Sequence, residues 1–315
     1  MLLDRRQAAC GLLAAAGALS AWRAFGQTPA DSASTPATAG DEPNTQLDTG
    51  RDPFEHMLAP VSINGEGPFN FLVDTGANVS CVSRDVAEQL KLTPGAPSPV
   101  HTAVGVRVRP TVIIDRLDVG ARKRRHVRVS TFPPMGAKID GILGVDWLSG
   151  QRLALDFKAK SLEITRSRDE LPLENRVIVP ARRRLGQLTI VDADLSGHRV
   201  SAMIDSGSQA TICNGALREL VVLLERGRPD NQLHMTVKME TLAGEPFTGE
   251  LLYLPFLHLG GLQLGNVPTV YAESHIFELW DLKRTPAIVL GMDLLTQFVA
   301  VALDYGRSRV RFDLA

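Results

Sequence analysis

The sequence predicts a mainly β protein with two similar lobes, related by a pseudo-twofold repeat, each carrying a short helix. The first observation is a pair of motifs, FLVDTGANVS at 71–80 and AMIDSGSQAT at 202–211, in which an aspartate follows an apolar run. The second is a further pair of apolar-Gly motifs, IDGILGVDWL at 139–148 and PAIVLGMDLL at 286–295. A repeat on this scale sets the architecture of a chain.

The elements around each aspartate motif repeat as well. A hairpin is expected before each motif, because alternating apolar residues flank the turns 64–67 and 196–198, which contain Asn, Gly and Ser. A helix is expected after each motif, because Ser83 precedes RDVAEQLKL and Asn214 precedes GALRELVVLLERG. Ser and Asn are favoured residues at helix N-caps.

The pairing of Asp-(Thr/Ser)-Gly with an apolar-apolar-Gly motif resembles the retropepsin-like and pepsin-like aspartic peptidases. The resemblance covers nearly all of residues 54–313, and it implies lobes over 52–166 and 175–315. The only tyrosines lie in the second half, so the resemblance is better to a bacterial, retropepsin-like tandem than to pepsin. The matching segments are Asp74-Thr75-Gly76-Ala77, which fits the viral-type signature, and Asp205-Ser206-Gly207-Ser208, a permitted variant.

The resemblance implies hydrolysis of peptide bonds by water held between Asp74 and Asp205. Two carboxylates about 3 Å apart cannot both ionise readily, so the pair shares one proton. The ionised partner would take a proton from water, and the protonated partner would polarise the scissile carbonyl. The expected substrate is an extended peptide or protein segment, and no cofactor is implied.

The residues after each aspartate have expected structural roles. Gly76 and Gly207 allow a tight turn and a close approach of the two backbones. The resemblance implies that the hydroxyls of Thr75 and Ser206 lie under the aspartates and bond to the opposite loop.

The fourth position of each motif differs, with Ala77 in the first and Ser208 in the second. A hydroxyl at Ser208 that donated to Asp205 would favour the ionised form of that carboxyl. On this hypothesis Asp205 is the more acidic partner.

The apolar-Gly motifs are expected to support the aspartate turns, because in the family each one packs across the turn of its own lobe. The residues expected in this role are Leu143, Gly144, Leu290 and Gly291.

Two segments are candidates for flaps that close over a cleft, 98–110 and 241–252, with Gly105 and Gly244 where a tip needs conformational freedom. The alternative interpretation is that both segments are ordinary hairpin turns.

The aspartate motifs have alternative interpretations. A single Asp-Thr-Gly is most often an ordinary turn, and a third copy at 48–50, without a preceding apolar strand, is read in that way. A non-catalytic peptide-binding protein of the same fold is the main alternative function. Enzymes with a phosphorylated aspartate usually carry a second Asp two residues on or a following Lys, and Asp74 has neither.

Composition limits the class of protein. With 315 residues, a net charge of −1 and 44% hydrophobic residues, the chain suits globular lobes, and nucleic acid is not an expected partner. The basic cluster 122–125 is expected on a solvated turn. Cys81 and Cys213 are expected to be buried thiols, and no spacing typical of a metal site is present.

The N-terminal segment is expected to direct export. Arg5 and Arg6 precede an apolar stretch, so residues 1–26 are read as a signal peptide, possible twin-arginine type, with a retained anchor as the alternative. Residues 27–51 are read as a disordered linker. We therefore expect a periplasmic or secreted bacterial protein, monomeric and without stable membrane insertion after signal removal.

Overall fold

The structure is a computed structural model, and it describes residues 43–315 except 52–55, 135–138, 149, 172, 191 and 225–234. The predicted signal peptide, 1–26, and residues 27–42 of the predicted linker lie outside the described residues.

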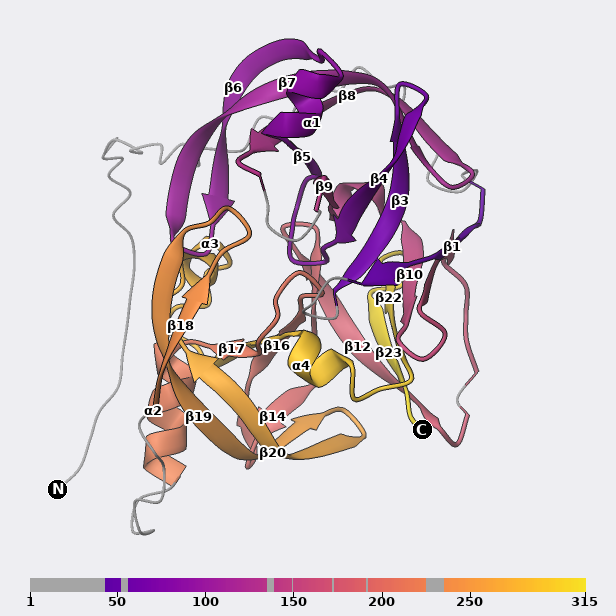
Figure 1. The fold of residues 1–315 in the computed structure, drawn as a ribbon. Coiled ribbons are helices and arrows are strands. Elements are labelled where there is room, and N and C mark those ends of the chain that lie inside the picture. Colours follow the sequence, from indigo (N-terminus) through magenta and orange to yellow (C-terminus); the bar gives the residue numbers. More distant parts are fainter. Residues whose placement is uncertain are drawn as a thin grey trace, which may run out of the picture. The chain divides into compact units, whose positions relative to one another are not determined.

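Strands dominate the described chain, and each half carries short helices, so the fold class expected from the sequence is confirmed (Figure 1). The elements of the first half are β1 (Thr45–Asp48), β2 (Gly50–Arg51), β3 (Met57–Ile63), β4 (Glu66–Val73), β5 (Cys81–Ser83), α1 (Arg84–Gln89), β6 (Thr93–Thr102), β7 (Gly105–Val119), β8 (Arg122–Phe132), β9 (Gly141–Leu143), the 3-10 helix η1 (Val145–Trp147), β10 (Gln151–Asp156) and β11 (Ser161–Arg166).

The second half follows a similar order, with the helix α3 added before its apolar-Gly strand. Its elements are β12 (Arg176–Arg184), β13 (Gln187–Ile190), β14 (Ala193–Leu195), β15 (His198–Arg199), β16 (Ser201–Ile204), β17 (Ile212–Cys213), α2 (Gly215–Leu224), β18 (Met235–Glu240), β19 (Pro246–Leu259), β20 (Leu262–Tyr271), α3 (His275–Leu279), β21 (Ala287–Leu290), α4 (Met292–Leu295), β22 (Ala300–Asp304) and β23 (Arg309–Asp313).

The strand that leads to each aspartate pairs with the apolar-Gly strand of the same half. β4 is parallel to β9, with Val73 opposite Leu143, and β16 is parallel to β21, with Ile204 opposite Leu290. A short strand then completes each unit, because β5 is antiparallel to β9 and β17 is antiparallel to β21. The two halves therefore build the same motif twice.

The turns and helix caps follow the sequence signals. The hairpin turns centre on Asn64-Gly65 and Ser196-Gly197, whose backbones all have positive φ, as two-residue turns of type I′ require. The Ser83 hydroxyl accepts a hydrogen bond from the amide of Val86 at 3.2 Å. The side-chain oxygen of Asn214 accepts one from the amide of Leu217 at 2.9 Å. Both N-cap predictions are confirmed.

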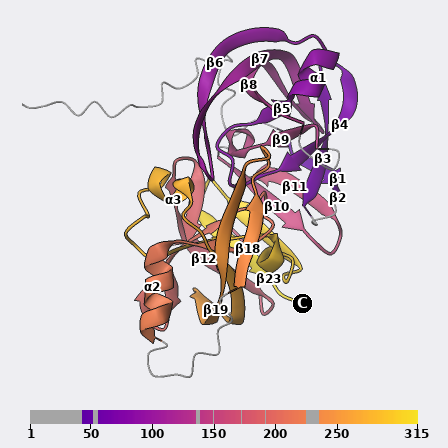
Figure 2. The same ribbon diagram turned by 60° about the vertical axis from the view of Figure 1, so that its left-hand side comes forward.

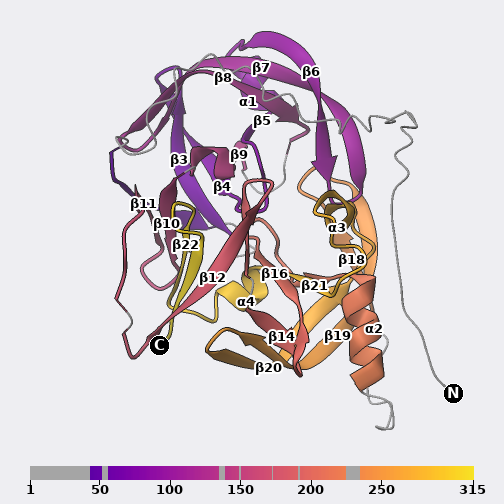
Figure 3. The same ribbon diagram turned by 180° about the vertical axis from the view of Figure 1, so that it is seen from behind.

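The closing hairpins of the two halves join in one sheet. β10 pairs with β22, with Leu155 opposite Val301, and the local strand order is β1-β11-β10-β22-β23-β12. Figure 3 shows β10, β22 and β12 in this order. Main-chain hydrogen bonds thus run continuously from one half to the other.

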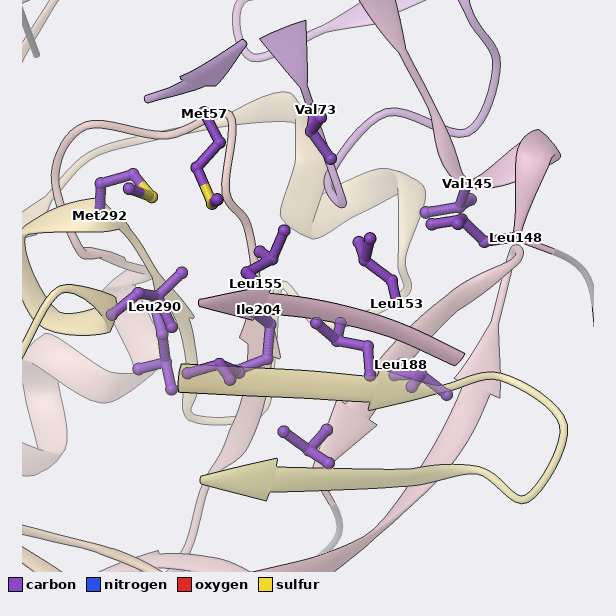
Figure 4. Close-up of a cluster of buried hydrophobic side chains, with 14 of the residues drawn as sticks. Met57, Val73, Val145, Leu148, Leu153, Leu155, Leu188, Ile204, Leu290 and Met292 are labelled. Atoms are coloured by element: carbon purple, nitrogen blue, oxygen red, sulfur yellow. The ribbon is translucent and has the colours of Figure 1, made fainter. Parts of the chain in front are cut away.

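One hydrophobic core also spans the halves. Figure 4 shows Met57 and Val73 of the first half near Leu155, with Leu290 and Met292 of the second half in the same cluster. Each of these side chains is at most 3% exposed. The turns that carry Asp74 and Asp205 are therefore supported by a single hydrophobic core.

The end of the predicted linker is ordered, so that prediction is wrong for residues 45–51. β1 pairs antiparallel with β11, where Thr45 lies opposite Ile164 and is only 2% exposed. β2 pairs with the start of β3. Composition alone cannot reveal that residues 45–51 form strands, because backbone pairing to a free strand edge needs few apolar side chains.

The basic cluster 122–125 is also not simply a solvated turn. The turn precedes it, and Arg122 is 1% exposed at the start of β8, where it donates to the side chain of Gln151 at 3.2 Å. Arg124 lies 4.4 Å from the ring centroid of Trp147 and donates to the backbone carbonyl of Asp146. Two of the four charges therefore hold β8 against the residues after β9.

Candidate active site

The two aspartates lie on turns directly after β4 and β16. We name these the first aspartate turn (74–77) and the second aspartate turn (205–208). The amide of Asp74 donates to the carbonyl of Leu143 at 3.0 Å, and the amide of Asp205 donates to the carbonyl of Leu290 at 3.0 Å. The parallel strand pairing therefore continues into each turn and fixes the position of the aspartate backbone.

The hydroxyls of Thr75 and Ser206 bind the two turns to each other. The amide of Thr75 donates to the Ser206 hydroxyl at 3.1 Å, and the amide of Ser206 donates to the Thr75 hydroxyl at 3.0 Å. Each hydroxyl then donates to a carbonyl before the opposite aspartate, Thr75 to Ile204 at 2.9 Å and Ser206 to Val73 at 2.7 Å. Both side chains are at most 1% exposed, so water does not compete for these bonds.

The glycines of the turns give room for the opposite carboxylates. A Cβ atom on Gly76 would lie 2.4 Å from Cγ of Asp205, and one on Gly207 would lie 2.3 Å from Cγ of Asp74. Any larger residue would therefore collide with the aspartate of the other half. This reciprocal fit brings Asp74 and Asp205 together as one aspartate pair.

Burial raises the pKa values of both carboxyls. For Asp74 the pKa lies well above the usual value, because of burial first and then the charge of Asp205. Burial also raises the pKa of Asp205, but the amide of Gly207, a hydrogen bond from Asp74 and the charge of His56 act against it. This difference favours a protonated Asp74 that donates to an ionised Asp205.

The prediction that the Ser208 hydroxyl donates to Asp205 is wrong. The Ser208 hydroxyl donates to the carbonyl of Ala210 at 2.8 Å, so this hydroxyl proton is not directed at the carboxylate of Asp205. Asp205 is nevertheless the carboxyl with the smaller rise in pKa, because of the Gly207 amide and the two neighbours Asp74 and His56.

A second hydroxyl in each half ties the aspartate turn to its apolar-Gly motif. The Ser80 hydroxyl accepts from the amide of Gly144 at 3.0 Å and donates to Asp146 at 2.9 Å. At the equivalent place the Thr211 hydroxyl accepts from the amide of Gly291 at 3.1 Å and donates to Asp293 at 2.7 Å.

Sequence reasoning gave these four polar residues, Ser80, Asp146, Thr211 and Asp293, no role. The signal was present, since a hydroxyl follows each paired aspartate at the same spacing and an aspartate follows each apolar-Gly motif. A further link runs from the amide of Val145 to the carbonyl of Ala77 at 2.9 Å. A Cβ atom on Gly144 would lie 2.8 Å from that same carbonyl oxygen.

The candidate flaps are hairpins whose ends meet. Gly105, the first residue of β7, has a φ of 142°, and Gly244, between β18 and β19, has a φ of 77°. The Thr102 hydroxyl donates to Glu245 at 2.8 Å, and Arg107 pairs with Glu245 at 3.3 Å. Figure 1 and Figure 2 show the end of β6 beside α3 and the β18–β19 hairpin.

The end of β6 also binds the start of α3. The carbonyl of Ala103 accepts from the amide of His275 at 2.8 Å and from the hydroxyl of Ser274 at 3.0 Å. Nδ1 of His101 lies 2.9 Å from Nε2 of His275. We call this set of bonds across the halves the flap contact, and it comprises Thr102, Arg107, Glu245, His101, Ala103, Ser274 and His275.

The two described cysteines are buried free thiols, as expected, and burial raises the pKa of Cys213 to about 12. Within the described residues no three His, Cys, Asp or Glu side chains form a group that could hold a metal ion. In the same residues no helix is long and apolar enough to cross a membrane.

Replacing Thr75 by Val keeps the side-chain shape and removes the hydroxyl between the turns. The amide of Ser206 and the carbonyl of Ile204 then lose buried partners, so the free energy of unfolding should fall by at least about 1–3 kcal/mol. Chemical denaturation measures this value. Thr75→Ser, which keeps the hydroxyl, is the matched control and should lose much less, whereas equal losses in both variants would contradict the account.

Replacing Asp74 by Asn should stabilise the fold at neutral pH. Because the folded-state pKa of Asp74 is raised, its contribution to stability is full below the unfolded pKa of about 3.9 and is lost as pH rises through the folded pKa. We expect a higher Tm for the variant at pH 7.5, by about 2–4 °C for each kcal/mol that the substitution adds to the free energy of unfolding. The difference in Tm between the variant and the wild type should shrink toward pH 4.

The control for this measurement is Asp115→Asn, which removes one charge from an exposed side chain. A Tm of Asp74→Asn below that of the wild type at pH 7.5 would contradict a raised pKa, and so would a difference that does not change with pH.

Comparison with known proteins agrees with this geometry. Residues 59–150 match the family described as "gag-polyprotein putative aspartyl protease", and residues 191–294 match the family described as "Aspartyl protease". No curated protein matches the chain. Each matched segment contains one member of the aspartate pair, and two such domains follow each other in one mainly β chain. The chain thus belongs to the retropepsin-like aspartic peptidases, a family of hydrolases.

Proposed function

We propose that the chain is an aspartic endopeptidase that hydrolyses peptide bonds with water activated between Asp74 and Asp205. The observation that carries the proposal is the reciprocal fit of the two aspartate turns. Each carboxylate lies against the glycine of the other turn, and the Thr75 and Ser206 hydroxyls hold both turns in place.

The chemistry follows from the unequal proton affinity of the pair. The ionised Asp205 takes a proton from water while the water oxygen attacks the scissile carbonyl carbon, and Asp74 gives its proton to the carbonyl oxygen. The resulting diol then loses the amine. Asp205 passes its proton to the leaving nitrogen, one diol hydroxyl returns a proton to Asp74, and the pair regains its starting state.

The substrate that we propose is an extended segment of a peptide or protein between the aspartate pair and the two hairpins. β6 is the last strand in its sheet, and within the described residues β18 pairs only with β19. Both strands therefore offer unpaired main-chain groups to an extended chain. The flap contact must open for a long substrate to enter, so we assign the flap role to the β6–β7 and β18–β19 hairpins, with Gly105 and Gly244 near their ends.

We further propose that the protein acts as an exported monomer, periplasmic or secreted. The support for export is the residue pattern of 1–26, and the support for a monomer is that one chain supplies both aspartates. A peptide-binding protein without turnover is the competing function, and the activity measurement separates the two.

Asp74→Asn and Asp205→Asn should each reduce peptide cleavage at least about 1,000-fold, because either change removes the exchange of protons that the reaction needs. A mixture of diverse peptides, incubated from pH 3 to 7.5 and read by mass spectrometry, measures the cleavage. Asp115→Asn, on an exposed strand position, is the matched control and should cleave as the wild type does. Wild-type protein that is folded and retains peptides but cleaves none would support the binding function instead.

The flap contact should weaken at acidic pH. Burial and the nearby charge of His275 lower the pKa of His101, so the neutral form of His101 suits the contact and its protonation beside His275 creates repulsion. Glu278, at 3.5 Å from His275 and paired with Lys283, offsets this repulsion in part, and Glu245 holds the other side of the contact.

Spin labels at the exposed positions Val108 and Met235 report the separation of the hairpins. The wild-type distance distribution should shift to longer distances between pH 7.5 and pH 5, and His101→Ala should give the long distances at both pH values. Val106→Ala, on the same hairpin, is the matched control and should behave as the wild type does. A wild-type distance that is independent of pH would refute the prediction.

A further inference from the structure

Each half has a small apolar cluster that is separate from the main hydrophobic core. The two clusters use matching positions of the repeat. Leu72 and Met203 each lie two residues before an aspartate of the pair, and Ile142 and Val289 each lie two residues before the glycine of an apolar-Gly motif. We name these the first cluster and the second cluster. The first cluster comprises Leu58, Leu72, Cys81, Phe132, Ile139 and Ile142.

The two clusters are covered in different ways. The second cluster is completed by its own half, because Phe277 of α3 and the following Trp280 and Leu282 are buried in it. In the first half, the connection 133–140 is shorter than the matching connection 272–286, and the described part of it contains no helix. The first cluster therefore needs side chains from elsewhere to exclude water.

Part of the cover of the first cluster comes from the opposite half. Among the described residues, the partly buried side chains packed against it are Ala77, Val100, Leu242 and Ala243. Leu242 and Ala243 form the tip of the β18–β19 hairpin, so the second half supplies them. Ala77 belongs to the first aspartate turn. The side chain of Leu242 thus packs on the same cluster as a residue next to the aspartate pair.

Polar bonds hold this tip in place. The amide of Thr241 donates to the carbonyl of Glu245 at 3.0 Å, and the amide of Gly244 donates to the carbonyl of Thr241 at 2.9 Å. The Glu245 carboxylate lies 4.0 Å from Nη2 of Arg109. The guanidinium of Arg109 lies 5.3 Å from the ring centroid of Phe132, a member of the first cluster. These bonds define a docked position of the tip beside the first cluster.

We infer that Leu242 and Ala243 occupy the place of an aliphatic side chain of the peptide substrate, so the β18–β19 tip is an internal competitor for binding at the first cluster. The inference rests on the proposed peptidase function and deepens it, because it names a substrate class. That class is peptides with an aliphatic residue beside the bond that is cleaved. Such a peptide displaces the tip and takes over its apolar contacts.

The tip has the properties of an occupant that can leave. Leu242 and Ala243 are only partly buried, whereas the members of the first cluster are at most 8% exposed. Arg107, which pairs with Glu245, has a side chain that is 55% exposed, and an ion pair of this kind contributes little stability. Release of the tip therefore costs little compared with the removal of a side chain from the main core.

The second cluster does not offer a matching place. Phe277, Trp280 and Leu282 fill it, and each of them is at most 5% exposed. The selection of an aliphatic residue should therefore act on one side of the scissile bond only, the side that lies over the first half.

The test measures equilibrium binding of peptides to Asp74→Asn protein, which does not consume them. The probes are two peptide mixtures of equal length, randomised among polar residues except at one central position, which is leucine in one mixture and glycine in the other. Leu242→Ala in the same background removes the competing side chain. Leu223→Ala, at a 50% exposed leucine of α2, is the matched control.

Leu242→Ala should bind the leucine mixture at least about threefold more tightly, because a leucine side chain no longer competes for the first cluster. The glycine mixture should gain little, since glycine leaves the tip in its docked position. Leu223→Ala should bind both mixtures as the background does. An unchanged affinity of Leu242→Ala for the leucine mixture, or an equal gain for both mixtures, overturns the inference.

Spin labels at Val108 and Met235 give a second readout, which needs no peptide. Leu242→Asp places a charge against the first cluster, so the distance distribution at pH 7.5 should shift to longer distances than in the wild type. An unchanged distribution would mean that Leu242 does not hold the tip, and it would overturn the inference.

The two proposals fail in distinguishable ways. If the wild type cleaves no peptide but the leucine mixture binds as stated, the proposed function fails while the competition at the first cluster stands. If the wild type cleaves peptides and Leu242→Ala gains no affinity, the inference fails alone.

Discussion

The structure depends on keeping two carboxyls, which repel when both are ionised, in contact inside a folded protein. Burial raises the pKa values of Asp74 and Asp205, so their approach costs stability whenever both would ionise. The reciprocal bonds between Thr75 and Ser206 oppose this cost at the point of contact. Behind the turns, the continuous sheet through β10 and β22 and the shared hydrophobic core prevent the halves from separating.

A nearly symmetric scaffold carries an asymmetric site. Strand pairing, glycine contacts and the hydroxyls of Ser80 and Thr211 repeat closely in the two halves. Hydrolysis needs one base and one acid, and a single proton shared by the pair supplies both.

Much of the fold and the centre of the site could be predicted because the repeat displays them directly. The aspartate turns, the N-caps Ser83 and Asn214 and the paired apolar-Gly motifs are local patterns. What could not be predicted depends on distant partners. β1 forms because it pairs with the edge of β11, and Arg122 is buried where it donates to Gln151. The direction of the Ser208 hydroxyl depends on the carbonyl of Ala210.

The central claim is that the pair holds one proton, carried by Asp74 and donated to Asp205. Neutron diffraction from deuterium-exchanged crystals near pH 5 would locate that proton directly. The account predicts a single deuteron between the two carboxyls, bonded to Asp74, with the facing oxygen of Asp205 bare. A deuteron bonded to Asp205, or a pair that carries none, would contradict it.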